Sequence, residues 1–156
     1  MKITALEEYG LRCLLQLARS GKLGLSISEI AKREGLSTEY VSKITAILRK
    51  GSLIASKRGL KGGYYLTHMP HEITLSQVQK VLGDMLFGDQ FCGQHAGQQN
   101  ICVHEENCSV RSVWSVVDKY IGTIMEQVTI ADLLNPELIA RKKIEAVVAA
   151  SVQHGE

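Results

Sequence analysis

Three of the four cysteines in the sequence lie close together, at Cys92, Cys102 and Cys108. Thiolates are soft ligands that suit zinc, copper and the iron of iron–sulfur clusters. Structural zinc sites usually include two cysteines about two to four residues apart, and neither gap here is that short. Long intervening loops suit an iron–sulfur cluster, because the span between its ligands is larger. The spacing therefore favours an iron–sulfur cluster.

A cluster needs a fourth ligand, and this segment contains only three cysteines. His95 and His104 lie in the same segment, and either imidazole can complete a cluster or a zinc site with three cysteines. Two further interpretations stay open: inert buried cysteines, and a metal-free thiol switch in which two of these cysteines form a disulfide. Cys13 lies apart from the group, on the apolar stripe of a predicted helix, and is predicted to be a core residue.

The charge is distributed unevenly along the chain. Residues 1–70 contain twelve Lys and Arg against five Asp and Glu, a net charge of +7. Residues 71–156 contain six against eleven, a net charge of −5, so that the whole chain carries +2. A basic first half predicts contact with a polyanion such as nucleic acid, while the acidic second half has another role.

The hydrophobic pattern of the first half predicts a helix-turn-helix. Apolar residues recur at helical spacing over residues 5–18, which predicts a first amphipathic helix. A capping box beginning at Ser26 starts a short second helix, and Gly35 suits the left-handed position that ends it. Ser37 is a good N-cap for a third helix that runs to Gly51. Two helices joined by a short turn containing glycine form the helix-turn-helix arrangement.

Beyond this point the period falls to about two, which predicts short strands at residues 53–58 and 64–67 with a glycine-rich basic tip between them. A hairpin attached to a helix-turn-helix is the wing of a winged-helix domain. In such proteins the start of the second helix of the motif enters the major groove of DNA, and flanking basic groups hold phosphates. The predicted DNA-binding residues are Thr38, Glu39, Tyr40, Ser42, Lys43, Lys57, Arg58, Lys61 and Gly62.

The second half is predicted to be helical on both sides of the cysteine segment. A capping-box pattern at Thr74 starts one helix, and a long apolar stripe begins at Ser109. A helix of about 30 Å has little of its own small subunit to pack against, so we expect it to pair with a second copy. Thr129 to Leu134 is predicted to be a short appended element, and Pro136 is expected at the first position of a last helix.

These patterns predict a mainly α fold with a small β-hairpin wing. We expect a winged helix-turn-helix DNA-binding domain at residues 1–70, and a connecting helix with the cysteine-rich loop at residues 71–108. Residues 109–156 are expected to form the dimerisation helix and the C-terminal helix.

Several classes of protein do not fit the sequence. A hydrophobic content of 45% with only two prolines argues against disorder, and no apolar run reaches the roughly 18 to 20 residues of a membrane-spanning helix. No secretory signal is visible, so we expect a cytoplasmic protein without a membrane partner. No phosphate-binding glycine loop before a helix, nucleophile–base pair or paired-acid cleft is recognisable, and we do not expect an enzyme.

Five parts of the sequence together resemble one family. They are the opening Met1 to Thr4, the helix start Ser37 to Val41, the wing Arg58 to Tyr64, the three cysteines, and Thr129 to Leu134. The chain resembles the cluster-sensing winged-helix transcription regulators typified by the IscR, NsrR and RirA repressors. The resemblance implies a cytoplasmic homodimer with crossed long helices, in which each cysteine loop lies near the other subunit's DNA-binding domain. It also implies a palindromic operator in double-stranded DNA.

Two departures from that family bear on the fourth ligand. Arg111 stands where the member that senses cluster supply has a histidine, and the gap from Cys92 to Cys102 is longer than in that member. The nitric-oxide-sensing relatives carry an acidic residue at the position of Glu8, which reaches the cluster of the opposite subunit. The resemblance then implies Cys92, Cys102, Cys108 and Glu8 of the partner subunit as ligands, with four irons favoured over two.

The sequence therefore predicts a homodimeric DNA-binding transcription regulator, a repressor, that senses iron, redox state or nitric oxide through an iron–sulfur cluster. The alternatives are a metal-free thiol-switch regulator and a zinc-stabilised winged-helix regulator.

Overall fold

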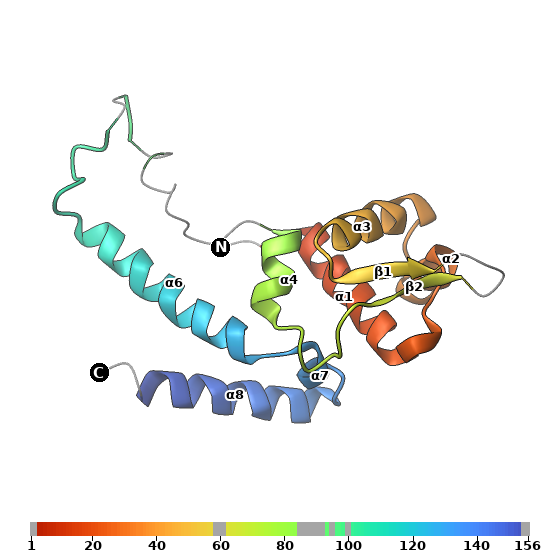
Figure 1. The fold of residues 1–156 in the computed structure, drawn as a ribbon. Helices are drawn as coiled ribbons and strands as arrows, with labels where there is room; N and C mark the ends of the chain where they lie inside the picture. The colour runs from red at the N-terminus through yellow and green to blue at the C-terminus, as the bar shows by residue number, and fades with distance from the viewer. Residues whose placement is uncertain (1–2, 58–61, 84–92, 94–95, 99–100, 154–156) are drawn as a thin grey trace.

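The computed structural model describes the whole chain except residues 1–2, 58–61, 84–92, 94–95, 99–100 and 154–156. The described part is mainly helical, with one antiparallel hairpin (Figure 1). The elements are α1 (Ala5–Ser20), the 3-10 turn η1 (Gly21–Leu23), α2 (Ile27–Glu34), α3 (Thr38–Lys50), β1 (Ile54–Lys57), β2 (Gly63–Leu66), α4 (Leu75–Leu82), α6 (Ser109–Gln127), α7 (Ile130–Leu133) and α8 (Glu137–Gln153).

Capping residues fix where the helices begin and end. The predicted capping boxes at Ser26 and Thr74 are both present, and a third box at Thr4 starts α1. Gly35 ends α2 in the left-handed region at φ 67°, as predicted. Helix α1 continues to Ser20, two residues beyond the predicted range, and Pro136 lies just before α8 rather than at its first position.

The wing is the predicted hairpin, with each strand end shifted by one residue. Its strands pair from Ile54 with Leu66 to Lys57 with Gly63. A further pair of backbone hydrogen bonds links Leu25, just after η1, to Tyr64 at distances of 2.8 and 2.9 Å. The segment before α2 therefore lies beside β2 and supports the wing along its second edge.

The hydrophobic core lies between α1, α2, α3 and the wing, and it extends past the predicted domain boundary at residue 70. Its fully or nearly buried members are Cys13, Leu14, Leu17, Leu25, Ile30, Ala31, Val41, Ile44, Leu48, Leu53, Ile54, Ile73, Val78, Leu82 and Ile130. The last four come from α4, α7 and the segment before α4. Residues 129–134 are therefore no appended element, because Ile130 belongs to the core of the winged-helix half.

Helix α6 is the predicted long helix, and it packs along α4 and α8 (Figure 1). None of its 19 residues, all of which are described, is buried within the single chain. Large apolar side chains on its N-terminal half are more than half exposed, namely Val110, Val113 and Val116. A contiguous exposed apolar surface of this kind is typical of a protein–protein contact.

Candidate nucleic-acid interface and cysteine site

The first turns of α3 present the side chains predicted to contact DNA. The Ser37 hydroxyl accepts the backbone N–H of Tyr40 at 3.2 Å, which fixes the start of this helix. Four of the predicted residues on this helix are exposed, namely Thr38, Glu39, Ser42 and Lys43. The opposite face is buried through Val41, Ile44 and Leu48, so the exposed face is held in one orientation by the core.

Tyr40 differs from the other predicted contacts because it packs inside the protein. Its ring is half-buried and meets the ring of Tyr9 edge-on, with ring centroids 6.0 Å apart. The guanidinium of Arg12 lies 5.5 Å from the centroid of the Tyr9 ring. Tyr40 therefore joins the start of α3 to α1, whatever contact its hydroxyl makes with DNA.

Glu39 carries a negative charge on a surface that is otherwise suited to phosphate. Its own backbone N–H, the Thr38 hydroxyl and the Ser37 hydroxyl lower the pKa of the Glu39 carboxyl. The Thr38 hydroxyl donates to the carboxylate at 3.2 Å. The carboxylate is therefore charged at neutral pH, and it can accept a hydrogen bond from the amine of a cytosine.

The wing supplies the rest of the predicted interface. Lys57 is exposed at the end of β1 and Gly62 is partly exposed, whereas Arg58 and Lys61 lie outside the described residues. Lys57 also lines a groove of about 500 Å³ together with Lys22 and His68. The sequence did not single out Lys22, because only the pairing of Leu25 with Tyr64 brings its turn beside the wing.

The cysteine segment is described only in part. Cys92 and His95 lie outside the described residues, and His104 is exposed. Cys102 and Cys108 are both partly exposed and have free thiols. Within the described ranges, no group of three or more His, Cys, Asp and Glu side chains is placed to hold a metal ion. One chain's described residues therefore do not by themselves complete the predicted site.

Cys108 is the N-cap of α6, and its Sγ accepts the backbone N–H of Arg111 at 3.3 Å. A hydrogen bond from a backbone N–H orients a sulfur that ligates a metal. Cys108 and the partly exposed thiol of Cys102 therefore fit the donor set of an iron–sulfur or zinc site. Arg111 contributes its backbone N–H to this contact.

Glu8, the predicted ligand from the partner subunit, is exposed on α1 and forms an ion pair with Arg12 at 2.7 Å. It lies at an apolar groove of about 250 Å³ between α1, α4 and α6. The residues lining this groove are Ile3, Glu7, Glu8, Leu11, Leu75, Val78, Gln79, Leu82, Ile121 and Met125. The structure does not group Glu8 with Cys102 and Cys108 of the same chain among the described residues.

Cys13 is a core residue, as predicted. Its side chain has no exposed surface, and burial raises the pKa of its thiol to about 12. A neutral, enclosed thiol of this kind is inert, so Cys13 is separate from the cysteine site.

The helix-turn-helix and the wing define a winged-helix fold. The family model Rrf2, described as an iron-dependent transcriptional regulator, matches residues 3–136. The chain belongs to the Rrf2 family. The match includes both the winged helix and the complete cysteine segment.

Relatives over most of the chain agree with this assignment. The protein rrf2 of Nitratidesulfovibrio vulgaris is 32% identical over 143 residues, which cover 91% of this chain and 93% of that protein. Among solved structures, T. potens IscR is 31% identical with a TM-score of 0.67 and covers 86% of each chain. CymR of B. subtilis, described as a global cysteine regulator, is 26% identical with a TM-score of 0.69 and covers 86% of this chain and 96% of its own.

These likenesses confirm the predicted fold class and the resemblance to this group of regulators. Members of the family are named transcriptional regulators, so the chain is a DNA-binding transcription regulator and not an enzyme. Within the described residues, each helix is too short or too polar to cross a membrane.

Proposed function

We propose that the chain is a homodimeric repressor whose affinity for a palindromic operator depends on an iron–sulfur cluster. The proposed ligands are Cys92, Cys102, Cys108 and Glu8 of the partner subunit, with a four-iron cluster favoured over a two-iron cluster. The observation that carries this proposal is the family match, which unites the winged helix and the cysteine segment under an iron-dependent description. Cytoplasmic localisation belongs to the same proposal.

The proposed DNA contacts are the exposed start of α3 and the wing. Thr38, Ser42 and Lys43 project from the first turns of α3, where helix-turn-helix proteins contact base edges. Glu39 and Tyr40 flank this surface, and the wing residues Lys57, Arg58, Lys61 and Gly62 complete the proposed set. The net charge of +7 on residues 1–70 supports a polyanionic partner.

The proposed dimer forms through α6. Its N-terminal half exposes Val110, Val113 and Val116, while its C-terminal half lines the apolar groove through Ile121 and Met125. A two-fold axis lets each subunit offer the same surface to the other, so both exposed halves are covered at once. Such a dimer presents two recognition helices to half-sites that lie about 34 Å apart.

The proposed cluster site uses the features of Cys102 and Cys108 described above. When bound, a cluster supplies iron and sulfide that react with oxidants or nitric oxide. Its assembly also depends on the supply of iron. Cys108 holds the first turn of α6, so its sulfur connects the site to the proposed dimer helix. Arg12 forms an ion pair with Glu8 on the surface of α1. This ion pair must break before the Glu8 carboxylate can bind iron.

The cluster is tested by anaerobic purification with iron and acid-labile sulfide assays and a visible absorption spectrum. We expect stoichiometric iron and sulfide with broad charge-transfer bands, and the iron count per chain distinguishes two irons from four. A variant with Cys92, Cys102 and Cys108 all replaced by Ala should fold but lose the absorbance. The control Cys13→Ala should keep it. Absence of sulfide from the purified wild type contradicts the cluster.

DNA binding is tested by fluorescence anisotropy as a function of salt. Each phosphate contact contributes about 0.9 to the slope of log affinity against log salt concentration. The variant Lys43→Gln should weaken binding and lower this slope by about that amount if its ammonium meets a phosphate. Lys80→Gln, on the exposed side of α4, is the matched control and should change neither. Salt-independent binding by the wild type contradicts the proposed interface.

A metal-free thiol switch is the second candidate function. The likeness to CymR, described as a global cysteine regulator, favours it, as do the accessible free thiols of Cys102 and Cys108. Mass spectrometry after mild oxidation distinguishes the two, because a disulfide removes two hydrogens and a cluster adds iron and sulfide. Zinc without sulfide in the purified protein would instead identify a zinc-stabilised regulator.

A further inference from the structure

The joint between α6 and α7 is attached to the winged-helix half by backbone hydrogen bonds. Leu75 donates its N–H to the carbonyl of Val128 at 2.9 Å, and Ile130 donates to the carbonyl of Ile73 at 2.9 Å. The N–H of Ala131 reaches the carbonyl of Pro70 at 3.1 Å. Residues 70–75 follow strand β2 after three residues, so the end of α6 is joined to the chain that leaves the wing.

Buried side chains make this attachment firm. Ile130 has no exposed surface and belongs to the core that also contains the buried face of α3. Val128 is 2% exposed. The C-terminal end of α6 therefore cannot move independently of the winged-helix half without opening its core.

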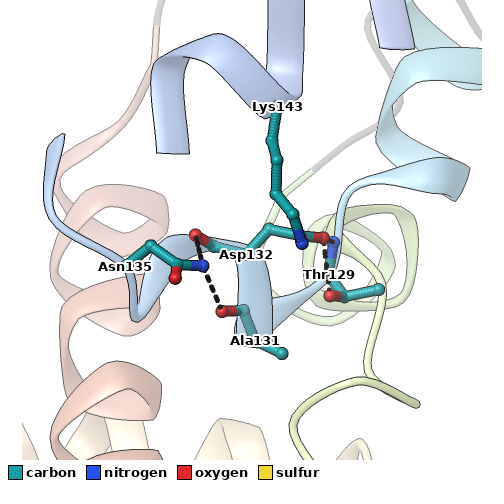
Figure 2. Close-up of polar contacts among 5 residues, drawn as sticks. All are labelled: Thr129, Ala131, Asp132, Asn135 and Lys143. Carbon is teal, nitrogen blue, oxygen red and sulfur yellow. Dashed lines mark hydrogen bonds and ion pairs between the residues drawn. The ribbon is translucent and has the colours of Figure 1, made fainter. Parts of the chain in front are cut away.

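Asp132 ties this joint to helix α8 (Figure 2). Its Oδ2 accepts the backbone N–H of Thr129 at 2.9 Å and the Thr129 hydroxyl at 2.7 Å. Its Oδ1 accepts Lys143 Nζ from α8 at 2.7 Å. Asn135 donates its side-chain amide to the carbonyls of Ala131 at 3.2 Å and Asp132 at 3.0 Å, which closes the turn into α8. One carboxylate thus holds the start of α7 and the body of α8.

The environment of Asp132 separates this contact from an ordinary surface ion pair. Only 18% of its side chain is exposed. Burial raises the pKa of Asp132, but the hydrogen bonds from Lys143 and Thr129 outweigh it and hold the pKa below its usual value. The ion pair between Arg141 and Glu145 lies on α8, as Lys143 does, and its side chains are 73% and 60% exposed. It therefore offers a matched control.

We propose that Asp132 is a positioning residue that sets the angle between the winged-helix domain and helices α6 and α8, and thereby the operator spacing that the dimer accepts. This inference rests on the proposed dimeric DNA-binding function. The geometry behind it is that α6 and α8 pack on each other, that α6 also packs on α4, and that α8 packs on α7. Lys143 is the contact through which Asp132 fixes α8 to that joint.

A small change of angle at this joint is enough to matter. Helix α6 has 19 residues and is therefore about 28 Å long. A rotation of about 10° at one end moves the other end by about 5 Å over that length. One base pair adds about 3.4 Å along the DNA axis. Loss of the Asp132 contact should therefore blur a preference for half-site spacing by about one base pair.

The test begins with an operator selected by the wild-type protein from random-sequence duplex DNA. Binding is then compared with two duplexes in which one central base pair is added or removed. We expect the wild type to bind both altered duplexes at least about tenfold more weakly, because spacing fixes the positions of the two recognition helices. In Asp132→Ala and Lys143→Met, the loss of affinity on the altered duplexes should shrink to less than about threefold. Asp132→Glu keeps the acceptor oxygens and should restore much of the preference, and Glu145→Gln should leave it unchanged.

The outcomes separate positioning from simple stability. If Asp132→Ala binds all three duplexes more weakly by the same factor, so that the spacing preference is intact, the inference is overturned. The proposed regulatory function is unaffected by that result. If Asp132→Ala does not fold, Lys143→Met decides, because its side chain is 60% exposed and its loss keeps the cap on Thr129. A wild type that recovers no palindrome, or has no spacing preference, overturns the proposed dimer and this inference together.

Discussion

Replacing Ile130 with Ala should destabilise the whole chain, although the residue lies far along the sequence from the winged helix. Its side chain has no exposed surface and belongs to the core of that half. The substitution removes three carbon atoms, worth about 2.4 kcal/mol of transfer free energy at about 0.8 kcal/mol each. The remaining cavity adds to this, so we expect a loss of about 3–4 kcal/mol in the free energy of unfolding.

The assay is urea and thermal unfolding at one fixed protein concentration, since the proposed dimerisation would make the midpoint depend on concentration. For a chain of this length the expected loss lowers the Tm by about 6–16 °C. Ile130→Val should cost about 0.5–1.5 kcal/mol. The control Ile139→Ala, at a side chain 51% exposed on α8, should cost much less.

Two results would refute this reasoning. An Ile130→Ala loss no larger than that of Ile139→Ala would mean that the joint does not share the winged-helix core. Separate unfolding transitions in the wild type, with Ile130→Ala affecting only one, would mean that residues 1–70 form an independent core. A single transition that shifts as a whole is the expected outcome.

Three further predictions follow from local geometry. Gly63→Ala should cost about 1–3 kcal/mol and weaken DNA binding, since its Cβ would lie 2.8 Å from the carbonyl carbon and oxygen of Leu25; urea unfolding and anisotropy check this. Cys13 should resist maleimide near neutral pH until the protein unfolds, and mass spectrometry of the labelled peptides checks this. The pKa of Cys13 is raised from 9.0 to about 12, so its contribution to stability is complete below pH 9 and is lost as the pH rises towards 12. Ser37→Ala removes the acceptor for the Tyr40 N–H and should cost about 1 kcal/mol in urea unfolding, and unchanged stability would contradict this cap.

The parts of the fold that were predicted correctly depend on neighbours in the sequence. The capping boxes at Ser26 and Thr74 and the left-handed Gly35 each involve residues within four positions. Helix stripes and the two-residue period of the wing are equally local. These signals fixed the order of the elements and their ends to within one or two residues.

The parts that were missed depend on contacts between distant residues. Periodicity shows that Ile130 is apolar, but it does not show which core receives it. The pairing of Leu25 with Tyr64 and the ion pair of Asp132 with Lys143 likewise have no local signature. Of these contacts, the burial of Ile130 joins the second half to the winged helix, so this joint was visible only in the structure.

The candidate site also has a part that the local sequence predicts and a part that it does not. The exposed positions on α3 follow from the amphipathic pattern, because the buried stripe at Val41, Ile44 and Leu48 leaves the other face to solvent. The set of cysteine ligands, by contrast, stays a prediction. A site that a second subunit completes cannot be recovered from the pattern of one chain, and Glu8 is paired with Arg12 on its own subunit.

Helix α6 has a different kind of attachment at each end. At its start, the sulfur of Cys108 accepts a backbone N–H, so the helix begins at a candidate ligand. At its end, the chain enters the winged-helix core through Ile130, and Asp132 fixes α8 to the same joint. A change at the sulfur can therefore reach the DNA-binding half of its own subunit through α6, which packs on α4 and whose far end is held by the core. If the cysteine site is a sensor, as proposed, this arrangement favours a response through the orientation of α6 over a local rearrangement of the wing.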